Sequence, residues 1–172
     1  MKHLVESVRA AVQERNWFAA LSGALALPDI CGRCEDASAG GSQRRYVAWF
    51  DKHLAGAYRR AVAGRLHTLL TGEDCYALRC AYSHGAEFDV SSQRARKVLT
   101  SYAFVAVPPG VTVHLNQVNT QLQLQVDLFC AEICSAVEAW MASVADQSEV
   151  QSRVEALPKI VLESPAVHAV QT

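Results

Sequence analysis

One arginine and one histidine lie close together near the end of a predicted helix, and the pair is suited to act on a phosphodiester. They are Arg79 and His84, in the stretch 73–85. An arginine guanidinium can hold two phosphate oxygens at once and keeps its charge, while an imidazole takes up or releases a proton near neutral pH. RNA carries its own nucleophile, the 2′-hydroxyl. A metal-independent ribonuclease therefore needs little more than such a pair.

The residues around this pair predict the helix that positions it. Thr71 is a suitable N-cap, Glu73 and Asp74 fall in the first turn, where the helix dipole favours acids, and Gly85 is suited to end the helix. Five residues correspond to about 500° of helical rotation, or about 140° net. Both side chains can therefore meet one ligand only if the last turn is loosened around His84.

The stretch 78–85 resembles the R-x4-6-H signature of HEPN domains, which are all-helical domains found in toxins, CRISPR-type ribonucleases and nucleotide-binding proteins. The resemblance implies one helical domain over residues 1–145. It also implies a homodimer, in which a two-fold axis brings two Arg79/His84 pairs into one cleft. In many HEPN domains the residue after the arginine is Asn, Asp or His, whereas here it is Cys80.

Two functions follow from this resemblance. The first is a metal-independent endoribonuclease of a toxin or defence system. In it His84 acts as general acid or base, Arg79 stabilises the charge on the phosphate in the transition state, and Tyr82 or Asp74 orients them. The second is a non-catalytic module that binds RNA or a nucleotide, or assembles with a protein such as a cognate antitoxin. Cys80 and the balanced charge favour the second.

The composition is that of one globular domain with almost no excess charge. With 172 residues, 51% of them hydrophobic, the chain can bury a core and is not generally disordered. The net charge is −1, so any contact with nucleic acid must be local. No stretch approaches the roughly 20 apolar residues of a membrane helix. The beginning of the chain lacks the pattern of a signal peptide. We therefore expect a cytoplasmic protein without membrane contact.

Basic residues gather in three short clusters. These are Arg44–Arg45, Arg59–Arg60 with Arg65, and Arg94–Lys97. The third cluster follows the helix that carries Arg79 and is placed to help hold a phosphate backbone. A solvated helix face is the alternative interpretation for each cluster.

The spacing of apolar residues predicts a mainly α fold, an up-and-down bundle of four to five helices. Apolar residues three and four apart predict helices over residues 5–25, 43–54, 58–70 and 121–145, beside the helix over 73–85. We expect a bend in the first helix near Asn16 and a break over 28–32. Shorter helices are predicted over 93–99 and 149–157.

One β-hairpin is predicted within this bundle, near residues 102–115. Its arms, 102–107 and 111–115, are rich in β-branched and aromatic residues and flank the turn Pro108-Pro109-Gly110. A lone hairpin is only marginally stable, so we expect it to pack on the helices or to pair with another subunit. Residues 146–172 are predicted to form a C-terminal extension whose last ten or so residues are loose.

Six cysteines raise three further hypotheses; they are Cys31, Cys34, Cys75, Cys80, Cys130 and Cys134. The C-x-x-C pair at 31 and 34 fits a redox site or, together with 130 and 134, a zinc site. Cys80 precedes His84 by four residues and is placed to serve as a nucleophile. Buried apolar cysteines are the ordinary alternative in such a protein. The predicted phosphodiester site itself needs no metal and no cofactor.

Overall fold

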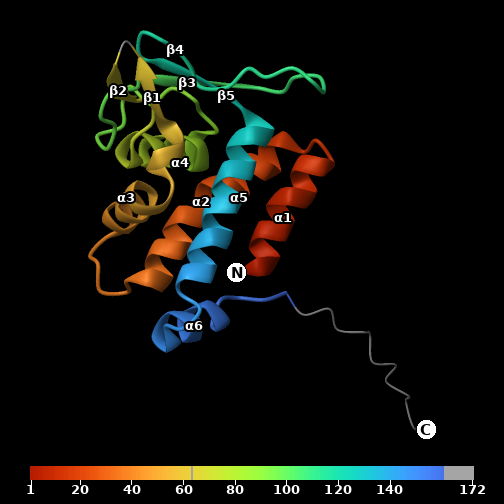
Figure 1. Cartoon of the computed structure of the whole chain (residues 1–172), viewed down its shortest axis with the longest axis vertical. Helices are drawn as coiled ribbons and strands as arrows, with labels where there is room; N and C mark the ends of the chain where they lie inside the picture. The colour runs from red at the N-terminus through yellow and green to blue at the C-terminus, as the bar shows by residue number, and fades with distance from the viewer. Residues whose placement is uncertain (63, 161–172) are drawn as a thin grey trace, which may run out of the picture.

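The chain forms a layer of helices with two small β-sheets at one end (Figure 1). A computed structural model describes residues 1–62 and 64–160. Its helices are α1 (Lys2–Gln13), α2 (Trp17–Glu35), α3 (Ser42–His53), α4 (Gly72–Gly85), α5 (Val126–Ser143) and α6 (Ser148–Glu155), with a 3₁₀ helix, η1 (Ala55–Tyr58). Its strands are β1 (Arg59–Val62), β2 (Arg65–Thr68), β3 (Ser101–Val105), β4 (Asn116–Val118) and β5 (Gln121–Gln125).

The predicted mainly α bundle of four to five helices with one hairpin is wrong, because the described chain has a mixed α/β fold. Beside the helices it contains a two-stranded sheet, β1–β2, and a three-stranded sheet in the order β3-β5-β4. Short apolar patterns do not distinguish a strand from a helix segment. Three of the five strands lay inside segments that the pattern assigned to helices.

Helix α2 lies at the centre of the helix layer, and α1, α3 and α5 pack against it. Two glycines permit this close packing. A Cβ atom at Gly23 would lie 2.8 Å from a methyl group of Val8 on α1, and one at Gly32 would lie 2.7 Å from the backbone oxygen of Arg45 on α3. Larger residues at these two positions would push the neighbouring helices away from α2.

The predicted first helix, over residues 5–25, is in fact two helices. The chain turns at Arg15, and Asn16 caps α2 by accepting a hydrogen bond from the backbone N–H of Ala19 at 3.3 Å, which confirms the predicted bend. The predicted break over 28–32 is wrong, because α2 continues through Pro28. Pro28 removes one helical hydrogen bond but is itself buried, and the packing of α2 against α1, α3 and α5 maintains the helix.

The predicted helix over residues 58–70 is also wrong, because these residues end η1 and form the β1–β2 hairpin. Arg60 lies opposite His67 in this antiparallel pair. Tyr58 and Leu70 are both 0% exposed, but they lie at the two ends of the segment. In the hairpin the described residues between them are exposed, except for the half-buried Leu69.

The predicted hairpin near 102–115 is wrong in its pairing. Its first arm is confirmed as β3, but β3 pairs in parallel with β5, and β4 pairs antiparallel with the other edge of β5. Residues 111–115, the predicted second arm, belong to no strand in the described chain. The parallel pairing joins segments that a tight turn cannot connect.

Strand β5 was hidden inside the predicted helix over 121–145. Its sequence alternates glutamine with leucine, and Leu122 and Leu124 are both 0% exposed, as expected for a strand with one buried face. The apolar residues of α5 follow directly after those of β5, so their spacing predicted one helix that also included the strand. Helix α5 begins only at Val126.

Three other predicted helices are confirmed within one or two residues, namely α3, α4 and α6. Thr71 caps α4 as predicted, by accepting a hydrogen bond from the backbone N–H of Asp74 at 3.1 Å. Within the C-terminal extension, α6 packs on α2, and Arg153 donates to the backbone oxygen of Cys34 at 2.7 Å. The predicted loose end of the chain, 161–172, lies outside the described residues.

The loop that follows α4 is shaped by the carboxylate of Asp74, which is 1% exposed. Its Oδ1 accepts hydrogen bonds of 2.7, 2.9 and 3.1 Å from the backbone N–H groups of Lys97, Val98 and Leu99. The Thr71 hydroxyl donates to Oδ2 at 2.8 Å. The predicted helix over 93–99 is wrong, because these backbone N–H groups bond to a distant side chain instead of to preceding carbonyls.

We expect Asp74→Ala to lower the free energy of unfolding by about 2–4 kcal/mol, because it leaves backbone N–H groups of the 97–99 segment without their acceptor. Urea denaturation followed by circular dichroism measures this loss. The control is Asp146→Ala, which removes an exposed carboxylate and should change stability by less than about 0.5 kcal/mol. Equal effects of the two substitutions would show that Asp74 does not have this structural role.

Candidate functional site

Arg79, the predicted phosphate-binding residue, forms an ion pair inside the protein. It projects from α4, and its Nη2 lies 3.3 Å from Oδ2 of Asp29 on α2. The Arg79 side chain is 27% exposed and that of Asp29 19%, so the pair is largely shielded from water. The guanidinium also lies over the ring of Tyr76, 5.9 Å from its centroid.

Asp29 is the centre of a small polar cluster that joins three helices. The Ser42 hydroxyl donates to its Oδ2 at 2.7 Å, and Arg45 Nη2 lies 3.9 Å from its Oδ1. Asp29, Arg79 and the pair Ser42 and Arg45 come from α2, α4 and α3 respectively. Asp29 thus supplies to the Arg79 guanidinium the oxygen that a phosphate would supply. A phosphate bound by Arg79 would have to compete with this carboxylate.

His84 lies apart from this cluster. It is exposed in the last turn of α4 and makes no hydrogen bond or ion pair with any described residue. The helix is regular through Gly85 and ends at Ala86, whose φ of 53° is left-handed. The last turn is therefore not loosened, and five residues of regular helix turn His84 about 140° away from Arg79. The catalytic roles assigned to Arg79 and His84 stay predictions.

The two residues proposed to orient this pair have other partners. Asp74 holds the loop after α4, as described above. The Tyr82 hydroxyl donates to the backbone oxygen of Phe18 at 3.0 Å and so fixes α4 to the beginning of α2. Neither of them hydrogen-bonds to Arg79 or His84.

The cysteines lie mostly in the core. Cys31, Cys34, Cys75, Cys130 and Cys134 are buried, and Cys80 is half-buried. Burial raises the pKa of the Cys130 thiol to about 12 and that of Cys134 to about 11, which disfavours the thiolate that zinc binding or redox chemistry needs. Burial also raises the pKa of Cys31 and Cys34. The described residues contain no group of three His, Cys, Asp or Glu side chains placed to hold a metal ion.

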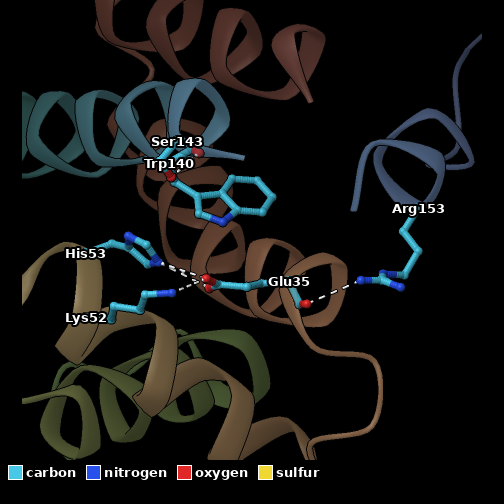
Figure 2. A network of polar contacts seen from close by, with 6 residues as sticks. All are labelled: Glu35, Lys52, His53, Trp140, Ser143 and Arg153. Carbon is cyan, nitrogen blue, oxygen red and sulfur yellow. Dashed lines mark hydrogen bonds and ion pairs between the residues drawn. The ribbon is translucent and has the colours of Figure 1, made fainter. Parts of the chain in front are cut away.

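A second polar cluster, which the sequence analysis did not identify, surrounds Glu35 at the end of α2 (Figure 2). The Glu35 carboxylate accepts a hydrogen bond from Lys52 and lies 3.1 Å from His53 Nε2. Arg153 of α6 donates to the backbone oxygen of Glu35 at 3.3 Å. The cluster fastens the ends of α2 and α3 to α6. Because its members lie far apart in sequence, no local spacing could have identified them.

The β1–β2 hairpin presents a basic surface, which we call the hairpin face and define by Arg60, Arg65 and His67. In an antiparallel pair, opposite residues share a face and alternate residues along a strand return to it. Arg60 lies opposite His67, and Arg65 belongs to the next pair on the same face. All three residues are exposed, and none forms an ion pair with a described residue.

The cluster Arg94–Lys97 lies in the loop beside this hairpin. Burial raises the pKa of the Asp51 carboxyl group, while Lys97 in the loop and Arg59 at the base of the hairpin act in the opposite direction. Lys97 is partly neutralised by Glu73, 3.8 Å away, and Arg96 donates to the backbone oxygen of Ser91. The sequence identified both basic clusters, but the helix predicted over 58–70 concealed the hairpin face.

Comparison with known proteins places the chain in no family. No family model matches it, and no curated protein or solved structure is significantly similar to it. None of the described helices has the length and apolar character needed to cross a membrane. The resemblance to HEPN domains stays a prediction that rests on the residues 78–85.

Because Arg79 and His84 have different surroundings, substitution of each should change the free energy of unfolding by a different amount. We expect Arg79→Ala to lower the free energy of unfolding by about 1–2 kcal/mol, because Asp29 loses a shielded partner. His84→Ala should change it by less than about 0.5 kcal/mol, since His84 is exposed and has no partner among the described residues. Chemical denaturation of both variants measures the difference. A larger loss for His84→Ala than for Arg79→Ala would contradict the structure.

Proposed function

We propose that this chain binds RNA without cleaving it, and that the hairpin face is its main contact with the phosphate backbone. The observation that supports this proposal is the exposed group of Arg60, Arg65 and His67, which no described acid neutralises. Arg60 and Arg65 belong to neighbouring pairs on one face of the hairpin, so their two positive charges lie a short distance apart. The overall charge of −1 does not reveal such a local surface.

The exposed hairpin suits a backbone contact better than the surroundings of Arg79 do. Arg79 and Arg45 share the carboxylate of Asp29, which reduces their attraction for a phosphate. A phosphate that binds the arginines of the hairpin face does not have to displace a described carboxylate. The loop residue Arg94 is exposed and extends the basic surface, whereas Lys97 is partly neutralised by Glu73.

RNA is proposed as the ligand because of the resemblance, and the hairpin face is proposed as the contact because its arginines are exposed and have no acidic partner among the described residues. The motif at 78–85 is similar to that of domains that act on RNA, and this is why RNA is proposed. The homodimer, the cognate antitoxin or other protein partner, and the cytoplasmic location stay predictions. The proposal concerns only the contact between one chain and RNA.

We expect Arg60→Glu/Arg65→Glu to weaken binding of single-stranded RNA at least about tenfold, because the substitutions replace two attractive charges with repulsive ones. Fluorescence anisotropy with a labelled strand of mixed sequence measures this. Wild-type affinity should fall roughly tenfold between about 50 and about 200 mM salt, as expected for a few phosphate contacts.

The matched control for this experiment is Arg33→Glu/Arg44→Glu. It makes the same change in net charge at two exposed arginines, on α2 and α3. The connection between these helices lies at the end of the helix layer away from the hairpin (Figure 1). If both double variants weaken binding equally, the hairpin face is not the contact. Tighter binding of duplex DNA than of RNA would overturn the choice of RNA.

We expect no cleavage when metal-stripped protein is incubated with single-stranded RNA in the presence of a chelator. Arg79 is held by Asp29, and His84 lies on another face of α4, so one chain does not bring the two side chains to one phosphate. Products ending in a 2′,3′-cyclic phosphate are the readout. If wild-type protein forms such products and folded His84→Ala protein does not, the chain is an endoribonuclease and the non-catalytic proposal fails.

A further inference from the structure

The side of α2 that faces solvent carries no charge over about three helical turns. Residues 17–28 contain no acidic or basic side chain. The next residue, Asp29, is largely shielded and forms the ion pair with Arg79. Helices at a protein surface ordinarily carry charged and polar residues on their outer side. An outer side without charge is typical of a helix that packs against another molecule.

An aromatic side chain protrudes from this part of α2. We call the surface the α2 face and define it by the residues of α2 that are exposed or half-buried there, namely Phe18, Ala19, Ser22, Gly23, Ala26 and Ile30. Phe18 is 69% exposed, and its backbone oxygen is held by the Tyr82 hydroxyl. Phe18, Ser22 and Ala26 follow one another at intervals of four residues and therefore form one ridge on the helix.

A groove of about 240 Å³ lies beside this ridge, between α1 and α2. Ala19, Gly23 and Ala26 line it from α2, and its lining residues carry no charge. The one hydroxyl in the lining, that of Ser7, already donates to the backbone oxygen of His3 at 2.8 Å. The groove therefore offers little to orient a polar ligand. A cavity of about 150 Å³ can hold a benzene ring, so this groove has room for the ring of a phenylalanine.

We propose that the α2 face binds the α2 face of a second copy of this chain, with Phe18 of each copy in the groove of the other. The two α2 helices run antiparallel, and a two-fold axis passes near Ser22. Phe18 precedes Ser22 by four residues and Ala26 follows it by four, so each Phe18 lies opposite the partner subunit's Ala26. The protruding ring and the groove thus match in a single symmetric contact.

The absence of charge favours a second copy over a different partner. Near a two-fold axis each residue lies close to its own counterpart, so a charged residue there would meet a like charge. The α2 face meets this requirement because its six residues are all uncharged. The exposed charges of α1, at Lys2, Glu6 and Arg9, line a different groove, the one between α1 and α5. An acidic or basic partner would gain no ion pair from the α2 face.

The size of the α2 face sets the expected strength of the dimer. From Phe18 to Ile30 the face is about 18 Å long, and with α1 it is two helices, or about 20 Å, wide. This footprint is smaller than the roughly 800 Å² that each partner buries in a standard stable interface, so we expect a dimer that dissociates at micromolar concentrations.

Sedimentation equilibrium of the whole chain without RNA tests the dimer directly. We expect the average mass to rise from that of one chain toward that of two between about 1 and about 300 μM. A mass that stays at one chain throughout would overturn the proposal. Growth beyond two chains would also overturn it, because a two-fold contact closes at the dimer. Because no RNA is present, the outcome does not depend on the proposed role of the hairpin face.

Substitution of the protruding ring tests the interface. We expect Phe18→Asp to raise the dissociation constant of the dimer at least about tenfold, because it places a carboxylate in an apolar groove. Phe18 is the second residue of α2, where the helix dipole favours an acid, so the fold should be retained. Val118→Asp is the matched control, since it makes the same change in charge at a side chain that is 68% exposed on β4. Equal effects of the two substitutions, or no effect of Phe18→Asp, would show that the α2 face is not the interface.

A cysteine near the proposed axis tests the arrangement without removing the ring. Two copies of Ser22→Cys lie close enough across the axis to form a disulfide, which needs Cα atoms within about 7 Å. We expect a mild oxidant to link this variant into a covalent dimer, while wild-type protein and Ser152→Cys, with its exposed change on α6, stay unlinked. Unlinked Ser22→Cys protein, at concentrations where the dimer forms, would overturn the antiparallel arrangement.

Discussion

The buried carboxylate of Asp74 is the interaction on which the placement of the sheet depends. It satisfies three consecutive backbone N–H groups just before β3, and the backbone oxygen of Asp74 accepts a hydrogen bond from the Tyr102 hydroxyl of β3 at 2.8 Å. One turn of α4 thereby fixes the loop and the first strand of the three-stranded sheet. Because β3 pairs with β5 and β5 leads directly into α5, this anchor also sets the sheet relative to the helices. An uncompensated carboxylate would not be tolerated at this depth.

The carboxylate of Asp29 likewise determines the contacts of Arg79, the arginine of the predicted motif. It brings Arg79 and Arg45 to one carboxylate and so connects α2, α3 and α4. An arginine with a shielded acidic partner contributes to packing and is less available to an external phosphate. Its chemistry is therefore decided by a residue that precedes it by 50 positions in the chain. His84 has no such partner among the described residues, and the regular end of α4 directs it elsewhere.

The near-zero net charge conceals an uneven distribution of paired and unpaired cations. Within the described chain, Arg9 pairs with Glu138, Lys97 with Glu73, and Lys52 with Glu35. Arg153 donates to backbone oxygens at the end of α2. These partners neutralise part of the positive charge elsewhere on the molecule, whereas no described acid pairs with the hairpin face. A surface that attracts a polyanion can thus exist on a chain whose total charge is slightly negative.

The sequence by itself determined those elements whose signals are local. The capping of α4 by Thr71, the extents of α3 and α6, and the bend at Asn16 follow from caps and apolar spacing over a few residues. The tertiary structure decided the strands and the position of the hairpin face. Strand β5 became a strand because β3, about 20 residues away, pairs with it, and β1 is a strand because it pairs with β2. Spacing can place Arg79 and His84 on one helix, but only packing shows that Asp29 binds one of them and not the other.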